Sequence, residues 1–385
     1  MFVARLRLVN FRSYHDATVE FAPGLNVIVG RNASGKTNLL EGAWFALRAS
    51  SPRTTRDDKA VRWGAGFARA EATVALREGD KHTFTVAYAP GQAKQARLDG
   101  AEVASLDELR RHGAVFIFVP ESLLLVKGSP ARRRAHLDAF AAGVDPAYEA
   151  GLRDLNLVLK QRNAQLWRVR EGAAADSLDA WDRQLARVAL AFEGRRRAIV
   201  ARLAGSYREF AAALAPEGGE FAVSLVSQLD ELDESSGESP EEAFVAALRA
   251  RRGGEVGRAV SGFGPHRDDL LFVEEGSPAP EGRAAARDLR LFGSQGEQRA
   301  AVLALLLAER AVAAELTGDL GALLLDDVMS ELDDARRRLL VSALTAGGQA
   351  IITTTNRLYF TAAELASAKV IELAGGDERA DLPDA

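Results

Sequence analysis

A glycine-rich segment near the N-terminus has the residue types and the spacing that bind nucleotide phosphates. It consists of Gly30, Arg31, Asn32, Ala33, Ser34, Gly35, Lys36 and Thr37, followed by Asn38. Glycines at this spacing let backbone N–H groups close around phosphates, the lysine reaches the β- and γ-phosphates, and the threonine hydroxyl is a magnesium ligand. The segment therefore predicts a P-loop that binds ATP with Mg²⁺.

The residues on either side supply the context that a P-loop requires. The apolar run 25–29 enters the loop, and residues 38–47 leave it with apolar side chains at helical spacing. A chance glycine-rich turn has no reason to lie between a strand and a helix. The order of strand, loop and helix favours phosphate binding over that alternative.

Two adjacent carboxylates follow a second apolar run. Residues 323–325 are all leucine, and Asp326 and Asp327 come directly after them. In P-loop ATPases a buried strand that ends in two acids is the Walker B element, in which one acid holds magnesium and its neighbour orients water. We expect Asp326 to share the magnesium ion with Thr37, and we expect Asp327 to position water. An acid pair that merely caps a turn is the alternative, and the P-loop argues against it.

A third motif precedes Walker B by some twenty residues. It reads Phe-Gly-Ser-Gln-Gly-Glu-Gln-Arg over residues 292–299 and lies just before an apolar helical pattern. The hydroxyl of Ser294, the backbone of Gly296 and the start of the helix form a candidate anion site that also contains Gln295. A capping box between Ser294 and Glu297 has the same spacing. The motif alone leaves both interpretations open.

Composition excludes several classes of protein. The 385 residues include no cysteine, so disulfide frameworks and thiolate metal sites are excluded, and a reducing, cytoplasmic location is expected. Residues 1–10 alternate apolar and charged side chains like a strand and unlike a signal peptide. No uncharged run approaches the roughly 20 residues of a membrane helix. With a net charge of −5, binding to nucleic acid would require a local basic surface.

The patterns predict a discontinuous α/β fold with a helical insertion. Residues 1–128 contain alternating strands and the P-loop, and residues 255–385 contain the third motif and Walker B. Residues 129–254 have apolar side chains three and four apart, which predicts a mainly α-helical arm. Within this arm, residues 177–214 are long enough for one helix of about 55 Å at 1.5 Å per residue. Gly194 and Gly205 are candidate breaks in that helix.

The order of these motifs resembles the head of an ABC-type ATPase with mixed β-sheets and helices, in which residues 292–299 correspond to the signature motif. Residues 330–333 match the D-loop of that family, and Thr355 occupies the position where transporters usually carry a histidine. The resemblance implies that two heads enclose two nucleotides, with the signature of one subunit on the P-loop of the other. It therefore implies an ATP-dependent homodimer, and Thr355 implies slow hydrolysis.

Further segments resemble the RecF family of SMC-like ATPases over nearly the whole chain. They are residues 10–14, 32–40, 119–130, 132–138 and 264–269. Ala33 departs from the pattern, because RecF-like loops usually have glycine there. The resemblance makes Arg12, Ser13 and Tyr14 candidate neighbours of the nucleotide base or α-phosphate. The arginine runs 132–134, 195–197, 251–252 and 336–338 are candidate contacts to DNA phosphates.

The RecF resemblance implies an ATP-dependent DNA-binding protein in the recombinational repair of gaps and stalled forks. Mg-ATP would close the dimer on double-stranded DNA near ss/ds junctions, and weak DNA-dependent hydrolysis would release it. The implied partners are RecR with RecO, and RecA is loaded as the outcome. The alternative is the ATPase subunit of an ABC transporter, which the long helical insertion and the absence of the histidine argue against. A small-molecule kinase or GTPase explains neither the signature nor the D-loop.

Overall fold

The computed structural model describes residues 1–76, 79–106, 109, 114–215, 219–232, 239–278, 284–345 and 347–373. The chain divides into two compact units. Unit 1 comprises Met1–Leu123, Phe210–Glu217 and Gln295–Ala385, and unit 2 comprises Leu124–Glu209 and Gly218–Ser294. The predicted boundaries between an ATPase head and an arm, after residues 128 and 254, stay a prediction. The last residues of that predicted head, 374–385, lie outside the described part of the chain.

A five-stranded parallel sheet forms the centre of unit 1. Its strand order is β14-β3-β13-β12-β8, with β14 at Lys369–Glu372, β3 at Leu25–Val29, β13 at Gln349–Thr354, β12 at Ala322–Leu325 and β8 at Val115–Phe118. β8, β12 and β13 are buried along their whole length, as expected for parallel strands covered on both faces. Since all five strands run in one direction, the carboxyl ends of β3 and β12 lie at the same edge.

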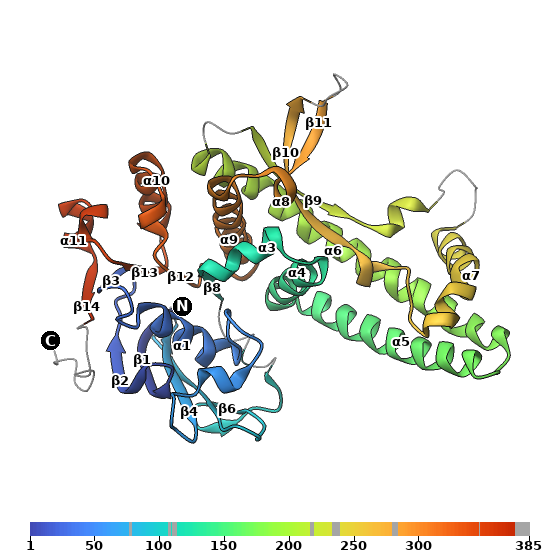
Figure 1. Ribbon diagram of the computed structural model, residues 1–385, viewed down its shortest axis with the longest axis horizontal. Coiled ribbons are helices and arrows are strands. Elements are labelled where there is room, and N and C mark those ends of the chain that lie inside the picture. Colours follow the sequence, from blue (N-terminus) through green and yellow to red (C-terminus); the bar gives the residue numbers. More distant parts are fainter. Residues whose placement is uncertain are drawn as a thin grey trace. The chain divides into compact units, whose positions relative to one another are not determined.

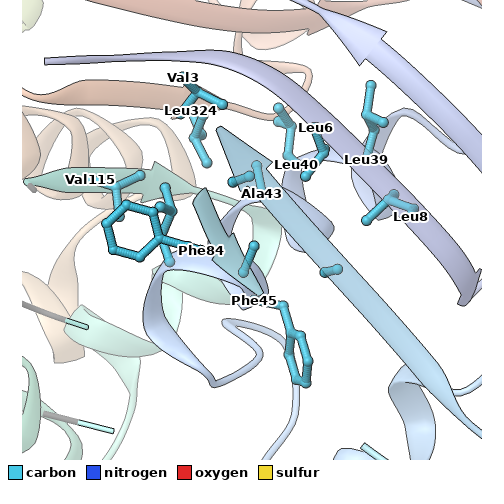
Figure 2. Close-up of a cluster of buried hydrophobic side chains, with 14 of the residues drawn as sticks. Val3, Leu6, Leu8, Leu39, Leu40, Ala43, Phe45, Phe84, Val115 and Leu324 are labelled. Atoms are coloured by element: carbon cyan, nitrogen blue, oxygen red, sulfur yellow. The ribbon is translucent and has the colours of Figure 1, made fainter. Parts of the chain in front are cut away.

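A six-stranded antiparallel sheet forms the other layer of unit 1, in the order β2-β1-β4-β5-β6-β7. The strands are β1 Phe2–Phe11, β2 Tyr14–Glu20, β4 Ala68–Ala75, β5 Lys81–Tyr88, β6 Gln95–Leu98 and β7 Ala101–Glu102. The helix α1, Lys36–Arg48, packs against β1, β4 and β5 and also contacts β13 and β8. Figure 2 shows the resulting core, in which Leu6 and Leu8 of β1 lie beside Leu39, Leu40 and Ala43 of α1.

The close packing of α1 on β1 explains a glycine in the middle of this helix. A Cβ atom at Gly42 would lie 2.5 Å from Cδ2 of Leu8, which is far inside van der Waals contact. Glycine is unfavourable in a helix interior by about 1 kcal/mol relative to alanine. Here it is retained because the helix and the strand have no room for a side chain between them.

The apolar helical pattern that follows residues 292–299 forms α9, Gln295–Thr317. Two further helices of unit 1 follow it in the chain, α10, Asp334–Thr345, and the short α11, Ala362–Ser367. α9 is buried over most of its length, which agrees with its nearly unbroken apolar sequence. In the described residues of both units, no helix combines the length and the apolar character needed to cross a membrane.

Unit 2 consists of helices and a three-stranded antiparallel sheet in the order β11-β10-β9. Its elements are α3 Leu124–Lys127, α4 Pro130–Val144, α5 Pro146–Arg170, α6 Asp179–Leu214, β9 Glu220–Val226, α7 Pro240–Arg258, β10 Asp269–Pro278, β11 Ala284–Asp288 and α8 Leu289–Phe292. The end of α6 belongs to unit 1. Figure 1 shows α5 and α6 running beside each other. The rings of Tyr148 on α5 and Phe192 on α6 lie with their centroids 4.9 Å apart.

The long helix α6 continues through both glycines that the sequence offers as breaks. The single helix that the sequence allows here is present, and neither Gly194 nor Gly205 interrupts it. Each glycine costs only about 1 kcal/mol in a helix interior. The helix buries Phe192 and Leu203 between and beside them, and burying one such side chain contributes about 1.5–3 kcal/mol. Packing therefore outweighs the local preference.

The segment 264–269 is the centre of a buried ion network in unit 2. Arg196 of α6 donates to a carboxylate oxygen of Asp268 at 2.7 Å and to the carbonyl oxygen of Pro265 at 2.5 Å. Arg133 of α4 makes two hydrogen bonds to Asp269, at 2.7 and 2.8 Å. Both arginines are buried. Arg133 and Arg196 are the middle residues of the runs 132–134 and 195–197, which were candidate DNA contacts. Both side chains instead stabilise the interior of unit 2.

His266 in this segment makes the stability of unit 2 depend on pH. Its Nε2 lies 3.0 Å from the carbonyl oxygen of Ser261, and burial lowers the pKa of the ring to about 4. Between pH 6.5 and about 4 the unfolded chain therefore binds a proton at this ring that the folded chain does not bind. The contribution of His266 is fully present above pH 6.5 and is lost as the pH falls toward 4.

We predict that His266→Gln removes this loss. Relative to the variant, the wild type should lose free energy of unfolding as the pH falls from 6.5 to 4. The loss should reach about 3 kcal/mol, because one pKa unit corresponds to about 1.4 kcal/mol. Urea unfolding of both proteins at several pH values measures the difference. His82, which is paired with Asp99 in unit 1, provides the control substitution His82→Gln. A constant difference between wild type and His266→Gln across the window would contradict the prediction.

Candidate nucleotide-binding site

The P-loop connects β3 to α1 in unit 1, and its backbone requires glycine at two positions. A Cβ atom at Gly30 would lie 2.5 Å from Oγ of Ser34. Gly35 has φ +100°, a left-handed conformation that side chains disfavour. Gly30 also donates its N–H to the carbonyl oxygen of Thr354 at the end of β13, at 3.2 Å. The loop is thus anchored at the carboxyl edge of the parallel sheet.

Lys36 folds back over this loop. Its Nζ donates to the carbonyl oxygens of Gly30 at 2.7 Å and Arg31 at 2.9 Å. The side chain is buried, and desolvation lowers the pKa of its ammonium group, while Asp327 and Asp326 oppose that shift. The ammonium group therefore lies among the loop carbonyls with two carboxylates nearby.

Asp326 joins the P-loop to Walker B. The hydroxyl of Thr37, at the start of α1, donates to Oδ2 of Asp326 at 2.6 Å. The other carboxylate oxygen accepts a hydrogen bond from Oγ1 of Thr353 at 2.7 Å. Asp326 is buried, so both oxygens need such donors. The structure brings together the two residues that the sequence predicts as magnesium ligands.

Thr353 is a residue of this site that the motifs do not reveal. Besides donating to Asp326, its Oγ1 accepts the backbone N–H of Asp327 at 3.0 Å. It lies near the carboxyl end of β13, between β3 and β12 in the sheet. The available signal is a polar residue at the end of a buried apolar strand. That signal becomes specific only when the order of strands is known.

Asp327 has an unusual conformation and environment. It has φ +46°, and its carbonyl oxygen accepts a hydrogen bond from the hydroxyl of Ser330 at 2.8 Å. Burial raises the pKa of its carboxyl group. Within the described part of the chain, Oδ1 of Asp327 is buried and has no hydrogen-bond partner. A buried acceptor without a protein partner can accept a hydrogen bond from a ligand or a water molecule.

The donor set fits magnesium bound together with a nucleotide. One hydroxyl and one carboxylate supply hard oxygen ligands, which magnesium prefers, and phosphate oxygens and waters usually complete its shell. Among the residues that the structure describes, no three His, Cys, Asp or Glu side chains form a metal cluster. The site therefore suits a cation that arrives with phosphates.

The other predicted contacts lie at the surface or around the loop. Arg31, Asn32 and Ala33 are exposed, Ser34 is buried, and Asn38 is half-buried on the first turn of α1. The signature residues Ser294, Gln295 and Gly296 are also exposed, where the chain passes from unit 2 to unit 1. Their predicted role against the nucleotide of a second subunit stays a prediction. Thr355 is exposed just after β13.

The parallel sheet, the P-loop and the Walker B acids define the head of an SMC-like ABC-type ATPase. Residues 2–373 match the family described as RecF/RecN/SMC N terminal domain. The DNA replication and repair protein RecF of Heliobacterium modesticaldum is 36% identical over 378 residues, which cover 98% of both chains. The RecF of Halalkalibacterium halodurans is 35% identical over 357 residues, which cover 92% of this chain and 93% of that relative.

The chain therefore belongs to the RecF family and functions in DNA replication and repair. A solved structure of the recombination mediator protein RecF with ATP has a TM-score of 0.78, at 26% identity, with 92% of both chains covered. The structure of an SMC head bound to ScpA has a TM-score of 0.53 at 17% identity. The match covers 93% of this chain and 91% of that chain, and it shows a shared fold. These matches do not favour the alternative of a transporter subunit.

We predict that Thr353→Val destabilises unit 1. The substitution keeps the shape of the side chain but leaves Oδ1 of Asp326 and the N–H of Asp327 without the partner they have in the wild type. The free energy of unfolding should fall by about 1–3 kcal/mol, the usual cost of an unsatisfied buried group. Urea unfolding measures it. Thr353→Ser retains the hydroxyl and should lose much less, and equal losses in the two variants would show that the hydroxyl is not responsible.

We also predict that Ala33→Gly stabilises the protein. Ala33 has φ +63°, a left-handed conformation that costs a residue with a Cβ roughly 1–2 kcal/mol. Because glycine also loses more chain entropy on folding, the net gain should be at most about 1 kcal/mol. Ala164→Gly, on the exposed face of α5, is the matched control. Its free energy of unfolding should instead fall by about 1 kcal/mol. Thermal unfolding of both variants tests the difference in sign.

Proposed function

We propose that this chain is an ATP-driven DNA-binding switch. Mg-ATP binding closes two copies head to head on duplex DNA near ss/ds junctions, and slow, DNA-dependent hydrolysis to ADP and phosphate releases them. The switch acts in the cytoplasm, in the repair of gaps and stalled forks, where it supports RecA loading together with RecR and RecO. Membership of the RecF family supports this proposal. The similarity to a RecF structure solved with ATP supports it as well. A further RecF structure, described as part of the RecFOR pathway, is 28% identical and has a TM-score of 0.77.

One observation carries the proposal: Lys36, Thr37, Asp326 and Asp327 converge at one edge of the parallel sheet. Thr37 and Asp326, whose oxygens lie 2.6 Å apart, would hold magnesium in the proposed complex. The ion would neutralise charge on the phosphates. Lys36 exchanges its bonds to the loop carbonyls for bonds to the β- and γ-phosphates.

Asp327 is proposed as the residue that positions the attacking water. Its buried Oδ1, which has no partner among the described residues, is available to accept a hydrogen bond from that water. Burial keeps the pKa of its carboxyl above the ordinary range, which makes it a better acceptor for a proton than a free aspartate. Thr355, in place of a histidine, is consistent with a slow turnover.

The proposed dimer uses the exposed signature. Ser294, Gln295 and Gly296 lie on the surface, where a second copy can present its nucleotide to them. Residues 330–333, which contain the D-loop motif, begin three positions after Asp327 in the chain. A sandwich of this kind makes dimerisation depend on ATP, because the nucleotide forms part of the contact.

The proposed DNA contacts are the arginines of the basic runs that the fold leaves available. Arg132, Arg195 and Arg338 are exposed, and the described residues provide them with no ion pair. Their neighbours Arg133, Arg196 and Arg337 are held within the fold. With a net charge of −5, the affinity for DNA should come from such local clusters and should fall as salt rises.

We predict that Lys36→Met abolishes ATP-induced dimerisation. Losing charge-assisted bonds of about 1.5–3 kcal/mol each should weaken ATP binding by roughly 10- to 100-fold. Light scattering after size exclusion measures the dimer, and fluorescence anisotropy measures duplex binding across a salt series. The exposed Lys81 of β5 provides the control Lys81→Met, which should behave as wild type.

In the wild type, ATP should raise duplex affinity, and salt should lower it. In Lys36→Met, the affinity measured with ATP should equal the affinity measured without ATP. DNA binding by the wild type that responds to neither ATP nor salt would contradict the proposed function, as would a Lys36→Met protein that still dimerises with ATP.

A further inference from the structure

A buried carboxylate lies on α1, one turn beyond the P-loop. Glu41 has no exposed surface. Arg12 makes two hydrogen bonds to it, at 2.5 and 3.0 Å, and the hydroxyl of Ser51 donates to it at 2.6 Å. Nη1 of Arg53 adds a longer bond of 3.2 Å. Neither the P-loop motif nor Walker B includes this residue.

The partners of Glu41 come from two different loops. Arg12 lies in the turn between β1 and β2, and Ser51 and Arg53 follow the end of α1. Burying a carboxylate without a cation would cost free energy of folding. Glu41 therefore binds both loops, and both pack against α1. Arg12 is held by two bonds, one of them short. Arg53 is held more loosely and is shared with Glu121 and Asn38, at 3.2 Å each.

The turn that carries Arg12 is strained. Asn10 has φ +50° and Arg12 has φ +53°, both in the left-handed region that residues with a Cβ disfavour. Such conformations persist only where the surroundings hold them. Here the N–H of Arg12 donates to the carbonyl oxygen of Ala60 at 2.8 Å, and the N–H of Arg62 donates to that of Asn10 at 2.8 Å. Besides these two backbone hydrogen bonds, the bidentate ion pair between Arg12 and Glu41 holds the turn through a side chain.

The same turn touches the P-loop. The hydroxyl of Tyr14 donates to the carbonyl oxygen of Gly35 at 3.1 Å, and Nδ2 of Asn38 donates to the hydroxyl of Ser13 at 2.9 Å. A Cβ atom at Gly35 would lie 2.9 Å from the Tyr14 hydroxyl. The turn thus packs directly on the left-handed residue that precedes Lys36.

We propose that Glu41 is a positioning residue of the nucleotide site. Glu41 fixes Arg12 and thereby holds the strained β1–β2 turn in place. That turn holds the backbone at Gly35 in the conformation that directs N–H groups toward phosphate. The inference rests on the proposed function in one respect, since it takes ATP to be the ligand of the P-loop. It assigns Glu41 no contact with the nucleotide.

A double-mutant cycle on ATP affinity tests this chain of contacts. The variants are Glu41→Gln, the pair Ser13→Ala with Tyr14→Phe, and all three substitutions together. ATP binding to the full chain is measured by isothermal titration well below the unfolding temperature, which is measured for each variant. Asp16→Asn is the matched control, because it breaks an exposed ion pair with Arg7 in the same β1–β2 hairpin.

If Glu41 acts through the turn, Glu41→Gln should weaken ATP binding about tenfold, the effect of losing one charge-assisted contact. The Ser13 and Tyr14 pair should also weaken it, and the triple variant should be no weaker than Glu41→Gln alone. Asp16→Asn should stay within about twofold, since exposed pairs contribute little. Should Glu41→Gln fail to fold, the Ser13 and Tyr14 pair still carries the test, because it leaves the Glu41 ion pairs intact.

Two results would overturn the inference while leaving the proposed function in place. One is wild-type ATP affinity in the Ser13 and Tyr14 pair. The other is a triple variant whose loss is the product of the separate losses, which would mean that Glu41 and the turn act independently. A wild-type chain that does not bind ATP would overturn the proposed function itself, and with it the ligand on which this inference rests.

Discussion

The hydrogen bond between Thr37 and Asp326 is the contact on which the candidate site depends. It joins residues 289 positions apart in the chain, and it forms because β3 and β12 flank β13 in one parallel sheet. Parallel strands align their carboxyl ends at one edge, which is where open α/β sheets bind ligands. Lys36, Asp327 and Thr353 reach the same place for the same reason. A different strand order would separate the P-loop from Walker B without altering either motif.

Inside each unit, several buried charged side chains are held by ion pairs or hydrogen bonds. Asp326 lies between two threonine hydroxyls, Glu41 lies between two arginines, and Arg196 in unit 2 lies between two aspartates. Removing one partner from such a pair commonly costs 3–5 kcal/mol, because the remaining charge stays buried. These contacts therefore specify geometry more than they add stability. In unit 1 the specified geometry is that of the P-loop and the acids facing it.

The two departures from the expected pattern act on different properties. Ala33 keeps the left-handed backbone of a glycine position, so the loop retains its path and the methyl group costs conformational energy. Thr355 lies on the exposed end of the segment after β13, where it supplies no imidazole for proton transfer. The first concerns stability, and in the proposed function the second concerns turnover. Neither removes a group that the proposed site needs for binding phosphate.

The sequence by itself determined the local elements of this protein. Side-chain periodicity and backbone sterics act over a few residues. They suffice to predict the strand Leu25–Val29, the two required glycines of the P-loop and the apolar helix before Walker B. Motif order and the segments that resemble RecF also indicate the family. Tertiary structure alone decided that α6 runs through two glycines, that Arg133 and Arg196 are internal, and that Thr353 and Glu41 adjoin the site. Those outcomes depend on which distant segments pack together, and that information lies in contacts between residues far apart in the chain.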